Sequence, residues 1–473
     1  MTIQEILILV LLSALLGWIS RKGQRENLIL VFSILLIYWL QPGSTLRYMD
    51  FWLPTGTIII TILSWLVTSK AEIRQSNSNL QVAALIGIVV IGLGILRYFD
   101  LGNFLGSIHP PKIESIVLVF LPIAAILLLS NKTKQISPIL LWLSFVGLIV
   151  VFILIKTPIL SYKVSFYWRT LAGQTPALAR SDEIRWLGYS YIAFRILHTI
   201  RDRLSGRLPD IMLREYFTFI IFYPSIVAGP IDRVENFIKE LQIFTTPFHD
   251  DIVKGGERIT IGLFKKFVLA DSLAIISLNN QNANQAYTVF GSWILLYAFS
   301  FQIFFDFSGY TDIAIGIGRL LNISMPENFK QPYTKPNLTQ FWNNWHMTLT
   351  NWFRSYFFNP LSRTLRKKKY SAIMILLITQ TSTMVLVGLW HGVTINFLIW
   401  GLWHGLGLLL QNRWSLFFKQ RFPNILGSSK HMSVLNVLGV LFTFHYVSLG
   451  WIWFVLTDPG HGWRFFTSLF GGA

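Results

Sequence analysis

Cysteine is absent from this sequence of 473 residues, and charged residues make up only 13% of it. Without cysteine the chain cannot form disulfides, thiolate zinc sites, iron–sulfur clusters or a cysteine nucleophile, so its chemistry must use histidine, carboxylates, hydroxyls or amides. A soluble domain carries roughly 25% charged residues, whereas 53% of this chain is hydrophobic and its mean hydropathy is +0.52. The composition excludes a soluble globular enzyme and predicts a membrane protein with several spans.

Acidic residues are scarce as well, since 22 Asp and Glu stand against 40 Lys and Arg, and the formal net charge is +18. The basic residues form neither a long tail nor a stripe of the kind that follows a phosphate backbone, so we expect no nucleic-acid partner. They gather in loops between hydrophobic runs, where Lys and Arg fix the orientation of membrane spans and contact anionic headgroups. The lipid bilayer is therefore the first partner that the sequence predicts.

Long apolar runs are frequent, and a membrane helix needs about 20 mostly apolar residues. We expect an all-α polytopic membrane protein with roughly 11 to 12 transmembrane helices plus interfacial and re-entrant helices. One interfacial helix is predicted over 254–271, where basic and apolar residues alternate. The candidate spans are Ile3 to Ile19, Leu28 to Leu40, Phe51 to Thr68, Val82 to Leu96, Ile116 to Leu129, Ile139 to Ile155, Leu213 to Val227, Val289 to Phe304, Ile373 to Val387, Asn396 to Leu410 and Val437 to Leu456.

The two parts of the chain differ in where their polar residues lie. The spans before residue 161 contain no charged residue in their middle, and buried ionisable groups mark function in membrane proteins. We therefore predict that 1–161 is a wall or an assembly region. From about Tyr162 polar residues enter the apolar runs, so the catalytic region is predicted over 162–473. No inverted repeat of the transporter kind is found.

Carboxylates and hydroxyls interrupt the apolar run that contains FFDFSGYTD, at Asp306, Ser308, Tyr310 and Asp312. A carboxylate at that depth costs about 2.5 to 3.5 kcal/mol on insertion scales unless it is paired or faces a wet cavity. These side chains are therefore predicted to face inward. Two interpretations stay open: a structural role, such as capping a helix start or pairing with Arg319, and a role in lining a substrate site.

A second polar group lies in QFWNNWHMTLTNWFR, where aromatic and amide side chains surround one histidine. At helical spacing the tryptophans share overlapping faces, with His346 beside them and Arg354 two turns later. A belt of interfacial aromatics would not explain the amides, whereas a polar pocket with aromatic walls would. The candidate pocket residues are Trp342, Asn343, Asn344, Trp345, His346 and Arg354.

Two LWHG units place His391 and His404 thirteen residues apart in otherwise apolar sequence. An imidazole in a membrane interior needs a partner or a function. A neutral His391 could take a proton from a hydroxyl as a general base. No Asp or Glu lies in either unit, and the histidines do not have helical i, i+4 spacing, so neither a Ser-His-Asp triad nor a metal site is predicted. Trp390 and Asn396, near His391 in the sequence, are further pocket candidates.

Several segments in a fixed order resemble the membrane-bound O-acyltransferase (MBOAT) family from about Tyr189 to Trp453. They are GPIDR (229–233), GLFKKFVLAD (262–271), FFDFSGYTDIAIGIGR (304–319), MPENF (325–329), FWNNWHMTLTNWFR (341–354) and the two LWHG units. The SGYTDIAIG and GLFKK segments are similar to the alginate O-acetylation branch. GPIDR and WHMTL are as similar to the branch that loads D-alanine onto teichoic acids.

The resemblance implies helices around a central funnel or tunnel, with an acyl thioester entering from the cytoplasm and an acceptor hydroxyl from the other side. In the family's pattern the two catalytic histidines fall on His346 and His391, and His404 is a weaker match that we expect to be structural. One imidazole would act as base, while Asn343, Asn344 or His346 would hydrogen-bond the thioester carbonyl. The substrate-binding or tunnel-lining residues are expected to be Asp306, Ser308, Tyr310, Asp312, Trp342, Asn343, Asn344, Trp345, Arg354, Trp390 and Asn396.

We therefore expect an enzyme of the bacterial cytoplasmic membrane that moves a small acyl group, acetyl in particular, to a hydroxyl of an extracytoplasmic polysaccharide or of a partner protein that accepts or passes on the group. It would hold no resident cofactor and would use acetyl-CoA or a carrier-protein thioester as co-substrate. The alternatives are D-alanyl transfer to teichoic acid and, from another class, an ion-coupled transporter. The donor's phosphates would contact basic residues that could equally form an ordinary positive-inside loop, namely Arg354, Arg363, Arg366 and Lys367 to Lys369.

Overall fold

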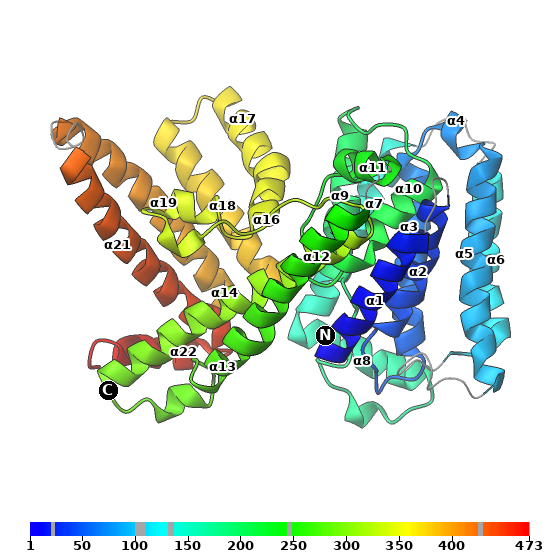
Figure 1. The fold of residues 1–473 in the computed structure, drawn as a ribbon, viewed down its shortest axis with the longest axis horizontal. Helices are drawn as coiled ribbons and strands as arrows, with labels where there is room; N and C mark the ends of the chain where they lie inside the picture. Colours follow the sequence, from blue (N-terminus) through cyan, green and yellow to red (C-terminus); the bar gives the residue numbers. More distant parts are fainter. Residues whose placement is uncertain (20–23, 100–109, 131–136, 244–247, 424–428, 473) are drawn as a thin grey trace. The chain divides into compact units, whose positions relative to one another are not determined.

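The structure is a computed structural model that describes residues 1–19, 24–99, 110–130, 137–243, 248–423 and 429–472 (Figure 1). Every regular element in these residues is a helix, which confirms the predicted all-α class. The chain forms two compact units: unit 1 comprises Met1–Glu257 and Ala314–Met325, and unit 2 comprises Arg258–Ile313 and Pro326–Ala473. The predicted boundary at residue 161 concerns function rather than packing, and it stays a prediction.

Unit 1 is built from helices whose apolar side chains cover most of their surface. In α7, for example, Ile139 and Leu143 are largely exposed, as expected of a helix whose solvent is lipid. Helices α5 and α6 stand side by side (Figure 1). The helices of unit 1 are α1 (Ile3–Ile19), α2 (Arg25–Trp39), α3 (Met49–Thr68), α4 (Ala71–Arg74), α5 (Asn77–Ile95), α6 (Ile113–Ser130), α7 (Pro138–Lys156), α8 (Pro158–Leu171), α9 (Tyr189–Leu204), α10 (Leu213–Ile221) and α11 (Val234–Gln242).

The helices of unit 2 include two pairs packed at backbone contact, α12 with α14 and α18 with α19. α12 and α14 each begin or end in unit 1. The π-helical segment η5 (Phe264–Ala270) follows α12, and η8 (Arg354–Phe358) follows α16. The α-helices are α12 (Phe248–Leu263), α13 (Asp271–Ile275), α14 (Val289–Leu320), α15 (Leu338–Trp342), α16 (Met347–Phe353), α17 (Asn359–Lys367), α18 (Ala372–His391), α19 (Ile395–Arg421), α21 (Ser429–Val455) and α22 (Pro459–Ser468).

Six helices among the described residues are long and apolar enough to cross a membrane, so the protein is a multi-pass membrane protein. Two further apolar helices, Ile3–Ile19 and Ile113–Leu129, are shorter. By length and composition, the described residues thus contain fewer spanning helices than the expected 11 to 12. The six spanning candidates are Met49–Thr68, Asn77–Phe99, Pro138–Lys156, Val289–Leu320, Ala372–His391 and His431–Val455.

The predicted span from Leu213 to Val227 is wrong. Helix α10 has only 9 residues and ends at Ile221, and a short 3₁₀ turn follows at Tyr223–Ser225. Pro224 explains the break, because proline lacks a backbone N–H and disfavours helical geometry in the residue before it. A 9-residue helix is about 14 Å long at 1.5 Å per residue, roughly half the thickness of the hydrocarbon core.

The close approach of α12 and α14 depends on two glycines that face each other. A Cβ atom at Gly309 would lie 2.8 Å from the carbonyl oxygen of Gly262, and one at Gly262 would lie 2.6 Å from the carbonyl oxygen of Gly309. Only glycine leaves room for such backbone contact. The contact brings Lys265 and Lys266, at the start of η5, beside the carboxylates of α14.

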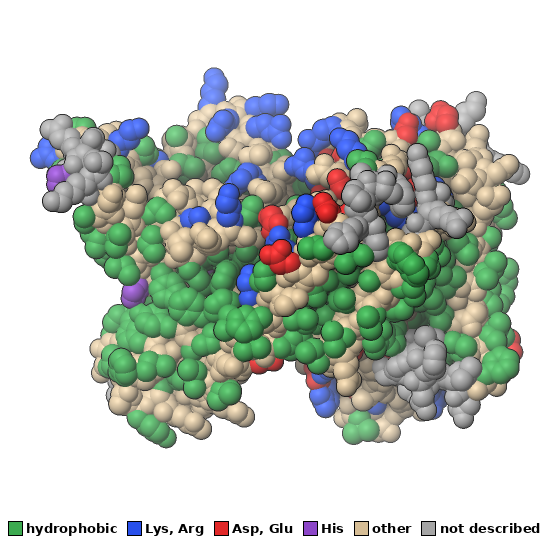
Figure 2. All heavy atoms as spheres, viewed as in Figure 1, with side chains coloured by type: hydrophobic (Ala, Val, Ile, Leu, Met, Phe, Trp, Pro, Cys, Tyr) green, Lys and Arg blue, Asp and Glu red, His purple; other side chains and the backbone are tan. Residues whose placement is uncertain are grey.

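The predicted continuous helix through the three tryptophans 342, 345 and 352 is wrong as well. Helix α15 ends at Trp342 and α16 begins at Met347, so the residues between them form a turn. In unit 2, Lys and Arg side chains gather over α17, whereas the surface toward the middle of the unit is largely hydrophobic (Figure 2).

Candidate active site

His346 lies in the turn before α16 and adopts a left-handed backbone conformation, with φ 44° and ψ 53°. Its side chain is buried, with 2% exposure. A residue other than glycine is uncommon in this region of backbone space, and such strained positions concentrate at functional sites. The observation therefore points to His346 as a functional residue independently of any motif.

Asn328 fixes which ring nitrogen of His346 carries the proton. Its side-chain oxygen lies 3.0 Å from His346 Nδ1 and accepts hydrogen bonds from the Thr348 backbone N–H at 3.2 Å and the Thr348 hydroxyl at 2.8 Å. Because the Thr348 N–H can only donate, the Asn328 atom that it meets must be the amide oxygen. Nδ1 of His346 then carries the hydrogen, and Nε2 is left with a free lone pair.

The other nitrogen of His346 is available for chemistry. Nε2 is buried and has no hydrogen-bond partner in the part of the chain that the structure describes. Burial lowers the pKa of the His346 imidazole well below its ordinary value, and the nearby His391 lowers this pKa further. The ring is therefore neutral near pH 7, which is the form in which an imidazole accepts a proton.

Aromatic rings enclose His346. Phe307 packs edge-on against the imidazole with ring centroids 4.7 Å apart, and Phe329 lies nearly parallel to it at 6.5 Å. Trp390 completes the enclosure at 6.1 Å. Such walls exclude water, which strengthens hydrogen bonds inside the site and protects a thioester from hydrolysis.

His391 shares the indole of Trp390 with His346. Its ring centroid lies 4.6 Å from that of Trp390, so the two imidazoles flank one indole. His391 is the last residue of α18 and is only partly buried. Phe397 and Phe454 also contact its ring, at 5.8 and 4.7 Å. The structure thus brings the two predicted catalytic histidines into one aromatic cluster of unit 2.

His404 occupies a different environment in the middle of α19. Its side chain is fully buried, and its ring packs against Trp400 at 4.8 Å and Trp342 at 5.1 Å. Neither ring nitrogen has a hydrogen-bond partner among the described residues. The structural role that we expect for His404 stays a prediction.

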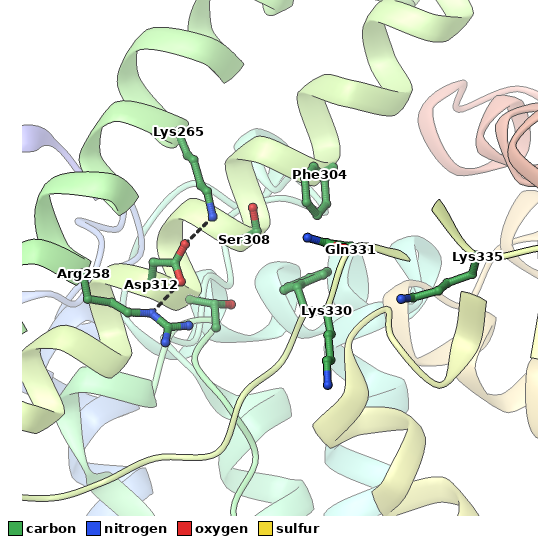
Figure 3. Close-up of a pocket in the computed structure, with 10 residues that line it drawn as sticks. Arg258, Lys265, Phe304, Ser308, Asp312, Lys330, Gln331 and Lys335 are labelled. Atoms are coloured by element: carbon green, nitrogen blue, oxygen red, sulfur yellow. Dashed lines mark hydrogen bonds and ion pairs between the residues drawn. The ribbon is translucent and has the colours of Figure 1, made fainter. Parts of the chain in front are cut away.

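A polar cavity of about 380 Å³ lies in unit 2, between α12 with η5, α14 and the segment that follows Pro326. Of the predicted substrate residues, Ser308 and Asp312 line it (Figure 3). We call it the basic cavity, because its lining residues are Arg258, Lys265, Phe304, Ser308, Thr311, Asp312, Phe329, Lys330, Gln331 and Lys335.

The carboxylates of α14 pair with basic residues of α12 and η5 rather than with Arg319, the partner considered from the sequence, and both the structural and the substrate-lining interpretation stay open. Asp312 accepts hydrogen bonds from Arg258 at 2.8 Å and from Lys265 at 2.6 Å (Figure 3). Asp306 pairs with Lys266 and does not line the basic cavity. The sequence could not show these pairs because the partners are 40 to 54 positions apart.

The remaining predicted residues do not gather around His346. Trp342, Asn343 and Arg354 line a second cavity of about 230 Å³, where Asn343 accepts a hydrogen bond from Arg354. Asn344 donates to the carbonyl of Gln340 at 2.7 Å. The other three are buried: Tyr310, Trp345, which stacks on Phe341, and Asn396, which donates to the Leu456 carbonyl. Both histidines lie outside the lining of these two cavities.

The sequence analysis did not identify Asn328 and Phe329 as residues of the site. Both lie in the MPENF segment, which contributed to the family resemblance, so the segment was recognised while its contact with His346 was not. Asn328 lies in an irregular segment 18 positions before His346, so no local sequence pattern indicated their contact.

Comparison with known proteins places these residues in a family context. The model of the MBOAT (membrane-bound O-acyltransferase) family matches residues 131–456. The teichoic acid D-alanyltransferase of Bacillus subtilis (strain 168) is 30% identical over 300 residues, which cover 62% of this chain and 74% of that protein. The probable alginate O-acetylase AlgI of Pseudomonas aeruginosa is 32% identical over 285 residues, and the peptidoglycan O-acetyltransferase of Helicobacter pylori is 32% identical over 290 residues.

Coverage differs between these relatives. The matches cover 60% and 58% of this chain but only 51% of the Pseudomonas protein and 52% of the Helicobacter protein, so the chain spans about half the length of these two relatives. All three relatives are acyl- or aminoacyl-transferring enzymes by name. The comparisons therefore set aside the ion-coupled transporter that was kept as an alternative.

Proposed function

Because this chain belongs to the membrane-bound O-acyltransferase family, we propose that it transfers an acetyl group from a cytoplasmic thioester to a hydroxyl of an extracytoplasmic polysaccharide, directly or through a partner protein. Acyl transfer as such follows from the family. The acetyl group is supported by relatives named as alginate and peptidoglycan O-acetylating enzymes. These relatives are proteins of the bacteria Pseudomonas aeruginosa and Helicobacter pylori, which supports a place in a bacterial cytoplasmic membrane.

The observation that carries the proposal is the free lone pair of His346 Nε2. The acceptor hydroxyl gives its proton to Nε2 as its oxygen attacks the thioester carbonyl carbon. The tetrahedral intermediate then collapses, the carbon–sulfur bond breaks, and the leaving thiolate takes the proton from the imidazolium. The acetyl ester and a free thiol are the products, and the histidine returns to its starting form.

His391 would act on the carbonyl oxygen in this scheme. Negative charge develops on that oxygen during the attack, and an imidazole N–H can stabilise it by a hydrogen bond. The sequence alone favoured the reverse assignment, with His391 as base. The assignment is exchanged here because Asn328 holds the tautomer of His346, whereas His391 lies at a helix end in a largely aromatic surrounding.

The test uses inverted membrane vesicles that contain the protein and a radiolabelled acetyl-CoA donor, with the envelope polymers of the source organism as acceptors. We expect label in polymer esters with the native protein and none with His346→Ala. The esters should be released by mild alkali. Consumption of palmitoyl-CoA in place of acetyl-CoA would contradict the proposal and point to a lipid acyltransferase.

A second candidate is D-alanyl transfer to teichoic acid. It is favoured by the match to the Bacillus enzyme, which covers 74% of that protein. The same vesicles supplied with a D-alanyl thioester of a carrier protein distinguish the two. Transfer from that donor alone, with acetyl-CoA inert, would replace the acetyl assignment and leave the two-histidine scheme in place.

A further inference from the structure

We propose that the basic cavity is a phosphate-binding site that holds the phosphate ester at the far end of the pantetheine arm of the donor. The identity of the donor rests on the proposed function. The capacity to bind a phosphate ester rests on the cavity itself. Its volume of about 380 Å³ falls within the range of small-molecule sites, roughly 300 to 1,000 Å³.

The cavity has more positive than negative charge. Four cationic side chains line it, and Asp312 is the lining carboxylate. Arg258 also pairs with Glu327, which leaves an excess of two positive charges. Lys330 and Lys335 supply that excess.

These two lysines are not neutralised by the protein. Within the described residues neither has a carboxylate within ion-pair distance. In Figure 3 the ammonium group of Lys335 points toward the cavity from the side opposite Lys265. An anion between the ammonium groups of Lys335 and Lys265 would form charge-assisted hydrogen bonds. Such bonds are stronger than hydrogen bonds between neutral groups.

Two hydroxyl groups in the wall of the basic cavity have no hydrogen-bond partner among the described residues. Ser308 and Thr311 are 3% and 2% exposed, and the hydroxyl of each is buried without a hydrogen-bond partner among the described residues. They stand three positions apart on α14, so they share a face of the helix. Buried hydroxyls are nearly always hydrogen-bonded in native proteins, and phosphate oxygens would accept from both.

The shape of the cavity wall is fixed before any ligand binds. The Lys330 backbone N–H donates to the Asn344 carbonyl at 3.0 Å, and the next residue, Gln331, has a left-handed backbone with φ 47°. On the other side, Gly262 and Gly309 set the spacing of α12 and α14. A preformed site loses less free energy in ordering its side chains when the ligand arrives.

The cavity lies next to the proposed base. Phe329 lines the cavity and also packs on the His346 ring, and Phe304, another lining residue, packs on Phe329 at 6.0 Å. A phosphate in the cavity is therefore separated from the imidazole by an aromatic side chain.

The basic residues of α17 are a poorer site for the same group. Arg363, Arg366 and Lys367 are exposed, and so are Lys368 and Lys369. Their charges are solvated and screened by salt. The phosphate contact that the sequence suggested for this segment is reassigned to the basic cavity.

The experiment measures binding rather than turnover, by titration calorimetry on the purified full chain in phosphatidylcholine nanodiscs. The probes are coenzyme A, 4′-phosphopantetheine and pantetheine, which lacks phosphate. For the double variant Lys330→Gln with Lys335→Gln we expect at least about a 10-fold loss of affinity for the two phosphate-bearing probes and no change for pantetheine. Ser308→Ala with Thr311→Val should lose about 3-fold and serves if the lysine variant fails to fold.

Matched variants decide between sites. Lys419→Gln removes an exposed cation of α19 in the same unit and should bind coenzyme A as the native protein does. Equal affinity in the double variant, or a larger loss when Lys367, Lys368 and Lys369 are all changed to Gln, would overturn the proposal. Nanodiscs that also contain phosphatidylglycerol separate the sources of phosphate. Displacement of coenzyme A by this lipid would assign the cavity to a headgroup and overturn the donor assignment.

The readout keeps this inference apart from the proposed function. If the binding result holds and no acetyl transfer is found in vesicles, the proposed reaction fails and the phosphate site stands. If transfer is found and the cavity variants bind coenzyme A normally, the reaction stands and the phosphate site fails.

Discussion

Each unit contains an ion pair between a basic residue and a carboxylate. The two pairs differ in whether the polar groups around them all have hydrogen-bond and charge partners. In unit 1, Arg169 forms an ion pair with Glu183. The carboxylate of Glu183 also accepts hydrogen bonds from the Ser165 and Thr45 hydroxyls and from the Arg180 backbone N–H. The group is neutral and each oxygen of the carboxylate has its partners, so it can hold α8 to the neighbouring loops and bind nothing else.

In unit 2, the carboxylate of Asp312 is also paired, yet its surroundings are not saturated. Lys330, Lys335, Ser308 and Thr311 line the same cavity, and among the described residues the two lysines lack a carboxylate partner and the two hydroxyls lack a hydrogen-bond partner. His346 Nε2 is unpaired in the same way. These two ion-pair clusters therefore differ in how completely their polar atoms find partners, rather than in the types of residue that form them.

The sharpest way to test this contrast is to remove the unpaired base. His346→Ala should lower acyl transfer by about 10² to 10⁴ because a general base is lost, with little change in folding. The rate is measured in vesicles and the folded fraction by thermal unfolding in detergent.

His404→Ala is the matched control, since it removes another buried imidazole of unit 2. It should cost stability through the cavity left between two indoles, while the folded protein keeps most of its rate. His391→Ala should lower the rate strongly. An equal loss of rate for His404→Ala would show that an unpaired buried nitrogen does not identify the base.

In the saturated cluster the opposite outcome is expected. Glu183→Gln leaves Arg169 buried without its counter-charge, which typically destabilises a protein by about 3 to 5 kcal/mol. The transfer rate per folded molecule should stay near the native value. Asp182→Asn, at the exposed neighbouring carboxylate, should change the melting temperature little.

The same carboxylate predicts a dependence of stability on pH. Burial opposes the charged form of Glu183, but hydrogen bonds from Arg169, Ser165 and Thr45 outweigh it and lower its pKa to about 2. The pKa of a Glu in the unfolded chain is about 4.3. The stability that Glu183 contributes is therefore fully present above that pH and is lost as the pH falls toward the folded pKa. Melting curves of the native protein and of Glu183→Gln should therefore converge as the pH falls from about 5 toward 2.

Asn328 tests how the open site is prepared. Asn328→Asp places a negative charge 3.0 Å from His346 Nδ1, and this charge should raise the pKa of the imidazole. The acid limb of the pH profile of kcat/KM should move to higher pH, while KM for the donor changes little. A loss of rate with no movement of that limb would indicate a purely structural role for Asn328.

The smallest effect is expected at the glycine contact that brings the charged residues of unit 2 together. Gly309→Ala forces α12 away from α14 and should cost about 1 to 3 kcal/mol of stability. Gly256→Ala is the control, because a Cβ atom there meets nothing within 4 Å and alanine favours a helix. Equal melting temperatures for the two variants would mean that the helices can separate at no cost.

Much of the fold could be predicted because a membrane span requires a long apolar run, which is visible directly in the sequence. The span predicted from Leu213 to Val227 contains Pro224, and the helix ends before this proline. The proline could therefore have shown that this run does not form a span. The count of 11 to 12 spans stays a prediction, because six of the described helices meet the length and composition of a span and two further apolar helices are shorter.

The site could be predicted only in part. His346 and His391 were recognised through their motifs, and Ser308 and Asp312 through the cost of polar groups in an apolar run. The contact of Asn328 with His346 depends on a turn that local helix periodicity concealed. The lysines of the basic cavity come from an irregular segment, and only tertiary packing places them opposite η5.

The left-handed backbone at His346 also limits how this enzyme could evolve. Glycine and asparagine tolerate a positive φ, whereas side chains branched at Cβ meet a steric barrier there. The replacements that keep the turn lack a basic ring nitrogen, and most replacements that fill the same volume disturb the turn. A saturation library at this position should therefore divide into variants that fold without activity and variants that fold poorly, so a lineage that once lost this histidine would have few single-step routes back except reversion.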